Sequence, residues 1–297
     1  YAPDARYGRS DGGDEESVAA IRRDDVERFW AGRYRPAGTT LVVVGDVSAD
    51  DARRIVEESF DAWQGSEADV RDPGAPPPDL PARASRAVHL VDKADAPQAE
   101  LRLGHVGLPR LHPDYFPVTV MNALLGGLFN SRINLNLRER HGYTYGASSR
   151  FVTRQGPGPF LVGAAVATES TGAAAREVLA ELRRIREELV EPAELAETRT
   201  YLTGVFPYTA QTIDDIAKRL ETLAVFELPD DYFDGYLDRL NAVTREQVRE
   251  VAERHLDPEC IAVVAVGPAE DLARQLEDLG PVEIKSRTAV AAPAVAV

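Results

Sequence analysis

Cysteine and long apolar runs are nearly absent from this chain of 297 residues, and each absence excludes a class of protein. The only cysteine, Cys260, lies in an apolar stretch, so a disulfide framework is excluded and a buried, unreactive thiol is expected. The longest apolar runs fall far short of the roughly 20 residues that span a bilayer, and no signal peptide opens the sequence. We therefore expect a soluble, cytoplasmic protein that does not enter a membrane; because residue 1 is Tyr rather than Met, an upstream targeting segment is left open.

The chain also has few positively charged residues relative to negatively charged ones. The net charge is −15, and lysine occurs only at Lys93, Lys218 and Lys285. Phosphate binding needs a basic patch, so this balance argues against a nucleic-acid partner. The proportions of hydrophobic residues (44%) and charged residues (28%) are ordinary for a globular protein, and the length suggests about two domains.

Metal and nucleophile motifs are missing as well. The five histidines are His89, His105, His112, His141 and His255, and no two of them lie within four residues of each other. The inverted zinc motif H-x-x-E-H, in which two His at i and i+4 hold Zn²⁺, is therefore absent. Any other metal site would need distant histidines to converge, which their spacing does not suggest, so we expect no metal ligands in this chain. Phosphate-binding loops and a G-x-S-x-G elbow are absent too.

One stretch, residues 126–149, carries the most information. Two glycines follow an apolar helix predicted over 118–125, and a second helix is expected to start at Asn130 or Ser131, both good N-cap types. On this second helix Phe129, Ile133 and Leu137 recur at i, i+4 and i+8 and should pack inward. Ser131, Asn134 and Arg138 fall on another face. Gly142 should end the helix before a strand over 143–151, which brings Arg138 and Tyr145 to one helix–turn–strand corner.

The remaining pattern alternates strands and helices. We predict strands at about 40–45, 86–92, 98–107, 143–153, 159–168, 260–266 and 282–285. Helices are predicted at about 24–34, 48–63, 171–189, 192–205, 209–226, 230–241, 244–255 and 269–279. Five prolines make residues 66–85 a Pro-rich linker, and residues 286–297 form a tail of small residues that we expect to be disordered.

An internal repeat indicates how these elements are grouped. Residues 23–45 align without a gap with residues 245–267, at a constant offset of 222. In both copies a helix leads through a proline to an apolar strand that ends in glycine. Residues 1–65 therefore look like the C-terminal part of a first domain, and residues 86–285 like a complete second copy. By this arithmetic, the counterpart of residues 86–222, about 137 residues, would lie upstream of residue 1.

The stretch Gly126–Gly146 resembles the second-domain signature of the pitrilysin–insulinase family of zinc peptidases, in the branch that includes mitochondrial processing peptidase. That signature reads approximately G-G-x-F-x-S-R-L-x-x-x-L-R-E-x-x-G-x-x-Y-G, and only Ile133, which replaces Leu, departs from it clearly. The resemblance implies an α+β metalloenzyme fold of the mitochondrial-processing-peptidase type. It implies duplicated domains, each with an antiparallel sheet covered by helices, of which the first is incomplete here.

The resemblance also implies a chemistry. In the family, the Arg and the Tyr that correspond to Arg138 and Tyr145 bind the substrate backbone beside the scissile bond. Hydrolysis in the family uses a zinc held by H-x-x-E-H, so the zinc would belong to a partner chain or to a missing N-terminal block. Without that context, Arg138 would be a solvated helix charge and Tyr145 a core aromatic residue.

Three interpretations stay open. In the first, which the particular residues of the motif favour, the chain is the zinc-free member of a heterodimer. Its partner is a zinc-bearing homologous subunit, and the heterodimer cleaves a peptide substrate. In the second, it is the C-terminal part of a single-chain zinc peptidase whose zinc motif lies upstream. In the third, it is a non-catalytic structural subunit like the core subunits of cytochrome bc complexes. Retention of both Arg138 and Tyr145 disfavours the third.

Overall fold

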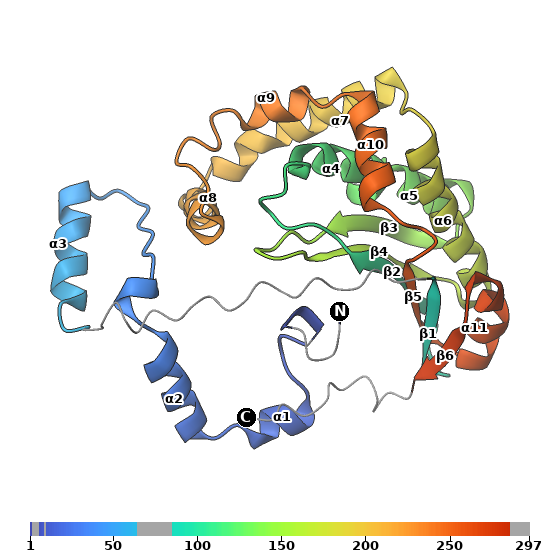
Figure 1. Ribbon diagram of the computed structural model, residues 1–297, viewed down its shortest axis with the longest axis horizontal. Coiled ribbons are helices and arrows are strands. Elements are labelled where there is room, and N and C mark those ends of the chain that lie inside the picture. Colours follow the sequence, from blue (N-terminus) through green and yellow to red (C-terminus); the bar gives the residue numbers. More distant parts are fainter. Residues whose placement is uncertain (2–5, 9, 64–84, 286–297) are drawn as a thin grey trace. The chain divides into compact units, whose positions relative to one another are not determined.

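The computed structural model describes residues 1, 6–8, 10–63 and 85–285 (Figure 1). These form two compact units. Of the described residues, one unit contains 1, 85–204 and 235–285 and holds the whole sheet; the other contains 6–8, 10–63 and 205–234. The predicted Pro-rich linker, apart from Ser85, and the predicted tail at 286–297 lie outside the described residues.

The larger unit is built on six strands in the order β3-β4-β2-β5-β1-β6. Their bounds are β1 Ala87–Asp92, β2 Ala99–Val106, β3 Thr144–Phe151, β4 Pro159–Val166, β5 Ala262–Gly267 and β6 Val282–Lys285. The family resemblance predicted an antiparallel sheet, and this is wrong for two of the five strand pairings, because β1 pairs in parallel with both β5 and β6. Apolar alternation is the same in parallel and antiparallel pairs, so the sequence pattern could not reveal strand direction.

Helices cover one face of this sheet. In chain order they are α4 Tyr115–Asn122, α5 Arg132–Asn134, α6 Thr171–Glu187, α7 Pro192–Val205, α9 Tyr236–Asn241, α10 Arg245–His255 and α11 Ala269–Leu276. Short turns complete the unit: two π-helical turns, η4 Ala123–Gly127 and η5 Leu135–Arg140, and the 3₁₀ turns η6 Thr168–Ser170 and η8 Glu277–Leu279. Figure 1 shows α6 and α10 on the same side of the sheet, and these two helices pack against each other.

The core lies between the sheet and these helices. Alternate strand residues and the inward stripes of the helices are fully buried: Val88, Leu90, Leu101, Leu103, Phe160, Val162, Ile133, Leu137, Leu179, Leu182, Val248 and Leu272. Each buried Leu, Ile or Phe side chain contributes roughly 1.5–3 kcal/mol of transfer free energy. The outward strand positions instead carry small or charged residues such as Glu100, Arg102 and Gly163.

The smaller unit consists of helices with little apolar burial. Its elements are η1 Arg6–Gly8, α1 Glu15–Ala20, α2 Arg23–Arg33, η2 Pro36–Gly38, α3 Ala49–Phe60, η7 Phe206–Ala210 and α8 Ile213–Phe226. Among the described residues, α1, α2, α3 and α8 bury no residue. Phe29 and Trp30 of α2 are 57% and 60% exposed. These helices present apolar faces that the described residues do not cover.

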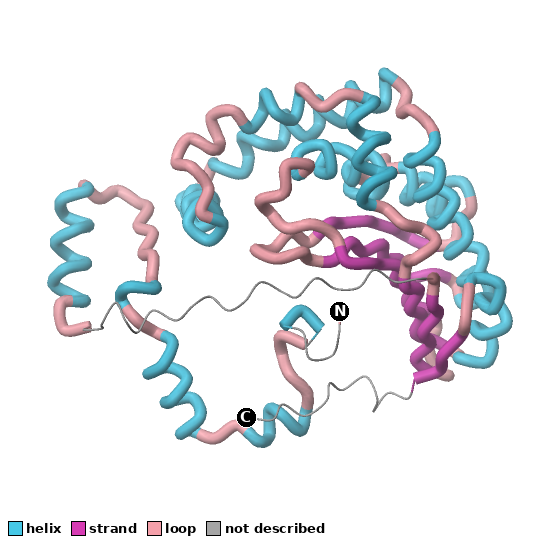
Figure 2. The backbone as a smooth tube through the Cα atoms, in the orientation of Figure 1, coloured by secondary structure: helices cyan, strands magenta, loops and turns pink. Residues whose placement is uncertain are grey.

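Several predicted elements differ from the structure. The strand at 40–45 is absent; the segment is drawn as loop (Figure 2), and Leu41 and Val43 are about half exposed. A strand forms only by pairing, and no described residue pairs with this segment. The helix predicted at 230–241 is shorter, Tyr236–Asn241, and the one at 209–226 divides at Gln211 into η7 and α8. No helix of the described part of the chain is long and apolar enough to cross a membrane.

Candidate functional site

The predicted corner forms as a tightly bonded loop–helix–strand unit. The helix that carries Arg138 begins after Ser131, which occupies the predicted N-cap position, and ends at Arg140, with Gly142 two residues beyond. Gly142 has a φ of 67°, in the left-handed region, and this conformation lets the Tyr143 N–H reach back to the Leu137 carbonyl at 2.9 Å. The last turn is π-helical, with the His141 N–H bonded to the Asn136 carbonyl. Single π turns inside helices are frequent at functional sites.

Two asparagine side chains, Asn134 and Asn122, hold this corner together. Asn134 is buried; its amide donates to the Phe129 carbonyl at 2.6 Å and accepts the Ala147 N–H at 2.9 Å. Asn122 donates to the Ser149 carbonyl at 3.2 Å and accepts the Ser149 hydroxyl at 2.8 Å. Because β3 is the first strand of the sheet, these two amides satisfy groups on its outer edge that would otherwise be unpaired.

Arg132 and Asn136 connect the corner to the neighbouring helices. Arg132 forms a bidentate ion pair with Glu194 of α7, with both N···O distances 2.7 Å. Burial raises the pKa of the Glu194 carboxyl, but the paired Arg132 guanidinium outweighs it and holds the pKa below its usual range. Asn136 donates to Glu181 at 2.8 Å and to Glu177 at 3.0 Å, both on α6. The backbone of the corner is therefore fixed on two sides.

Tyr145, unlike these bonded residues, is exposed to solvent. Its side chain is 91% exposed, the highest value among the large hydrophobic residues described. A β-bulge produces this: Thr144 pairs with Val166 and Ala147 with Ala164, so Tyr145 and Gly146 together oppose Ala165. Bulges redirect side chains and are common beside active sites. Tyr145 therefore projects from a rigid strand, and the interpretation of Tyr145 as a core aromatic residue is wrong.

An open cavity of about 420 Å³ lies beside Tyr145. It is lined by Gly126–Phe129, Asn134 and Tyr145–Ser148. Gly126 permits this arrangement, because a Cβ built there would lie 2.6 Å from the Ser149 backbone nitrogen. Phe129, predicted to pack inward, is 71% exposed and lines this cavity, since it precedes the first turn of α5. Ile133 and Leu137 are buried as predicted.

Arg138 contacts the Phe129 side chain, which lines this cavity. Its Cζ lies 4.6 Å from the centroid of the Phe129 ring, within cation–π distance, although Arg138 does not itself line the cavity. Its Nε is 3.5 Å from Glu139, and the side chain is about one-third exposed. Its Nη1 is buried and has no hydrogen-bond partner among the described residues. The structure thus brings Arg138 and Tyr145 to one corner. The Phe129 ring contacts the Arg138 guanidinium and lines the same cavity as Tyr145.

Sequence spacing missed a second cluster. His112, Asp114 and His255 each place one possible metal-ligand atom within 4.8 Å of the other two, although His112 and His255 are 143 positions apart. The expectation that these histidines would not converge is therefore wrong for this pair. Burial chiefly lowers the pKa of His112, and the nearby His255 lowers it further; for Asp114 burial raises the pKa, and bonds from His255 and Arg254 lower it overall. Only the tertiary packing of α10 against α4 produces this contact.

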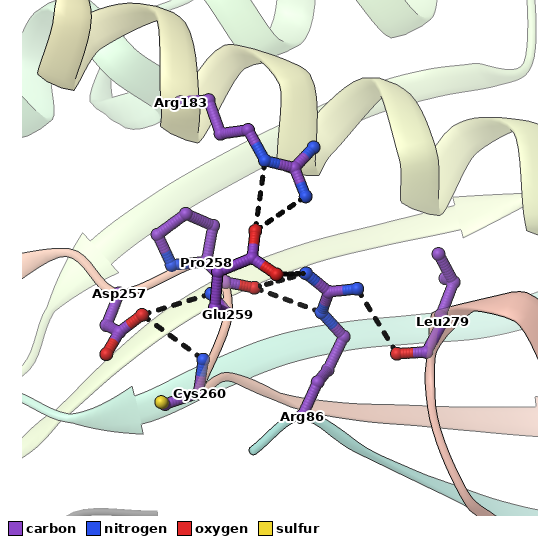
Figure 3. Close-up of polar contacts among 7 residues, drawn as sticks. All are labelled: Arg86, Arg183, Asp257, Pro258, Glu259, Cys260 and Leu279. Atoms are coloured by element: carbon purple, nitrogen blue, oxygen red, sulfur yellow. Dashed lines mark hydrogen bonds and ion pairs between the residues drawn. The ribbon is translucent and has the colours of Figure 1, made fainter. Parts of the chain in front are cut away.

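Cys260 belongs to a structural network. Figure 3 shows the Asp257 carboxylate accepting the Glu259 and Cys260 N–H groups, while Glu259 pairs with Arg86 and Arg183. Cys260 is half-buried rather than fully buried as expected. The hydrogen bond and negative charge of Asp257 raise the pKa of the Cys260 thiol, which favours the unreactive protonated form.

Fold and corner together define an α+β domain with a mixed six-stranded sheet, helices on one face, and an Arg/Tyr corner at its β3 edge. Residues 20–202 match the family described as "Peptidase M16 inactive domain". The chain belongs to the M16 peptidase family, through its inactive, C-terminal type of domain, and is related to zinc proteases and mitochondrial processing peptidase.

Three relatives illustrate the range of the family. The chain is 23% identical over 260 residues to "Uncharacterized zinc protease YmxG" of Bacillus subtilis, covering 88% of this chain and 61% of the relative. It is 27% identical over 276 residues to "Uncharacterized zinc protease SCO5738" of Streptomyces coelicolor (90% and 58%). It is 25% identical over 280 residues to "Probable mitochondrial-processing peptidase subunit beta" of Schizosaccharomyces pombe (89% and 59%). The chain thus spans about three-fifths of the length of these curated relatives.

Solved structures share the fold. A peptidase M16 inactive domain from Pseudomonas fluorescens superposes with a TM-score of 0.78 at 25% identity, covering 88% of this chain and 61% of that one. A protease from Helicobacter pylori gives 0.75 at 18% identity, with coverage of 86% and 61%. The second likeness, at this identity, concerns the fold alone.

Proposed function

We propose that this chain supplies Arg138 and Tyr145 as a substrate-binding pair to a zinc-dependent metalloendopeptidase whose zinc lies outside this chain. The observation that carries the proposal is the placement of Tyr145: it is 91% exposed on a bulge, while Asn134, Asn136 and Arg132 of the same signature are buried in structural bonds. A purely structural motif has no use for an exposed tyrosine beside an open cavity.

Each side chain of the pair has a definite chemical capacity. The Tyr145 hydroxyl has no partner among the described residues and can donate to a carbonyl of an extended peptide. Arg138 carries a fixed positive charge on a side chain that is about one-third exposed, which suits a carbonyl that becomes an oxyanion during hydrolysis. The rigid attachment of the corner by Arg132 and Asn136 would keep both donors in place before substrate arrives.

The residues described here do not fit the catalytic zinc of the family. That site needs two histidines four apart on a helix with a glutamate beside them, and the sequence has no such pair. We therefore assign the zinc to a homologous zinc-bearing subunit in a heterodimer. The relative named as a mitochondrial-processing peptidase subunit supports an assembly of this kind.

A single-chain enzyme is the second candidate. The chain spans about three-fifths of its relatives, and α2 Arg23–Arg33 and α10 Arg245–His255 have the same length at an offset of 222. Both facts support residues 1–65 as part of a first domain that precedes the complete domain 86–285. The zinc motif would then lie upstream in the same polypeptide. A non-catalytic role is the third candidate, supported by a relative in Bacillus subtilis named "Probable inactive metalloprotease YmfF".

One reconstitution separates these candidates. The purified chain with added Zn²⁺ is assayed on an unstructured peptide alone, then with a zinc-bearing M16 subunit, then as a polypeptide extended by an upstream block. Activity only with the second subunit supports the heterodimer, and activity of the extended chain supports the single-chain enzyme. Metal-dependent cleavage by the chain alone contradicts both, whereas inactivity of every combination favours the non-catalytic role.

A further inference from the structure

We propose that His112, Asp114 and His255 form a binding site for a divalent transition-metal ion of the zinc class. The site is separate from the peptidase zinc and does not depend on the proposed peptidase function. His112 and Asp114 lie in the loop that leads into α4, and His255 is the last residue of α10. A bound ion would join these two elements.

The geometry of the donor atoms fits such an ion. The Asp114 Oδ2 atom lies 2.6 Å from His255 Nε2 and 3.9 Å from His112 Nδ1. Ligands about 2.0–2.1 Å from a tetrahedral zinc ion are separated by roughly 3.4 Å, and the two observed distances fall on either side of this value. The two histidine nitrogens lie within 4.8 Å of each other, so movements of about an ångström would bring all three atoms to coordinating positions.

Metal binding would replace two hydrogen bonds of the cluster. The single lone pair of His112 Nδ1 accepts the Asp114 N–H at 3.1 Å, so an ion would displace this contact. His255 Nε2 lies 2.6 Å from the Asp114 carboxylate, so an ion would displace the proton between these two atoms. Two imidazoles and one carboxylate favour Zn²⁺, Co²⁺ or Ni²⁺ over the oxygen-preferring Ca²⁺ and Mg²⁺. Three protein ligands would leave a further position for water.

Arg254 would compete with a metal ion for Asp114. Arg254 Nη1 contacts the same Asp114 Oδ2 that faces His255. Among the described residues, Asp114 Oδ1 has no hydrogen-bond partner, so Arg254 can shift to this second oxygen when an ion takes the first. Arg254 should therefore weaken metal binding by its positive charge without blocking it.

Cobalt titration of the intact chain tests this site. We expect Co²⁺ to give visible d–d bands that saturate at one equivalent and disappear on addition of Zn²⁺. His112→Ala and His255→Ala should each weaken binding by at least about tenfold, since even loss of an outer partner costs that much. Arg254→Gln should bind more tightly than wild type. His89→Ala is the matched control and should bind like wild type, because His89 pairs with Glu283 at 3.0 Å but belongs to no group of three possible ligands among the described residues.

His112→Ala decides the question if His255→Ala proves unstable, because the His112 side chain is about one-third exposed and its ring accepts only one backbone N–H. Wild-type cobalt affinity in folded His112→Ala would overturn the proposal. So would an absence of d–d bands with the wild-type chain, or equal loss of binding in His89→Ala.

Discussion

Removing Glu194 from its ion pair with Arg132 should destabilise the protein more than removing Arg132. The Arg132 side chain is 9% exposed and that of Glu194 is 31% exposed, so the two charges differ in how easily water can replace the lost partner. Removing one member of a buried pair costs about 3–5 kcal/mol. Glu194→Gln leaves the guanidinium buried, with an Nη1 that already has no partner, and should cost about 3 kcal/mol. Arg132→Met leaves a carboxylate that water can reach and should cost only about 1 kcal/mol.

These costs translate into melting temperatures. For a domain of this size, 1 kcal/mol shifts the midpoint by about 2–4 °C, so Glu194→Gln should lower it by roughly 6–12 °C and Arg132→Met by roughly 2–4 °C. The loss of stability in Glu194→Gln relative to wild type should also depend on pH. The pKa of Glu194 is lowered in the folded state, so the stability that it contributes is present above the unfolded-state pKa and is lost as pH falls through the folded-state pKa.

The assay is thermal unfolding by circular dichroism from neutral to strongly acid pH. The deficit of Glu194→Gln relative to wild type should be largest near neutrality and should shrink in acid. Equal losses in the two variants, or a deficit that does not change with pH, would refute the assignment of a buried, charge-assisted pair that anchors the corner.

Three further results are expected. Gly126→Ala should destabilise by about 1–3 kcal/mol, because the new Cβ would approach the Ser149 backbone; Gly204→Ala, with open space around its Cβ, is the control and should not destabilise. Asn134→Ala should cost about 1–3 kcal/mol and speed hydrogen exchange of the Ala147 amide, which loses its acceptor; unchanged exchange would contradict the role of Asn134 as the acceptor at the edge of β3. Tyr145→Ala should leave the melting temperature within about 1 °C of wild type, because its ring is 91% exposed; a large loss would mean that the ring packs.

Local sequence patterns predicted much of the fold. Helix α7 and strand β6 have the predicted bounds, and Gly142 follows the end of its helix as predicted, because helix termination at glycine is a local property. The strand predicted at 40–45 is absent because a strand requires a partner, and none of the described residues provides one. Parallel pairing of β1 was missed for the related reason that alternation carries no strand direction.

The candidate site was also predicted only in part from local sequence. The signature pointed to Arg138 and Tyr145, and both lie at the expected corner, but the β-bulge that exposes Tyr145 depends on pairing with β4 and has no local signature. Phe129 follows the helical period yet lies outside the helix, so periodicity placed it wrongly in the core. The convergence of His112 with His255 depends on how α10 packs against α4, which spacing along the chain does not encode.

The central proposal concerns what Arg138 and Tyr145 do, and the turnover number of the assembled enzyme tests it most directly. In the active assembly with a zinc-bearing subunit or an upstream block, Arg138→Ala and Tyr145→Phe should each lower kcat by about 10²–10³-fold, the usual loss for an oxyanion donor. Tyr145→Phe should keep the wild-type melting temperature. Wild-type kcat in both variants would contradict the proposal and return Arg138 to a helix charge and Tyr145 to an incidental surface residue.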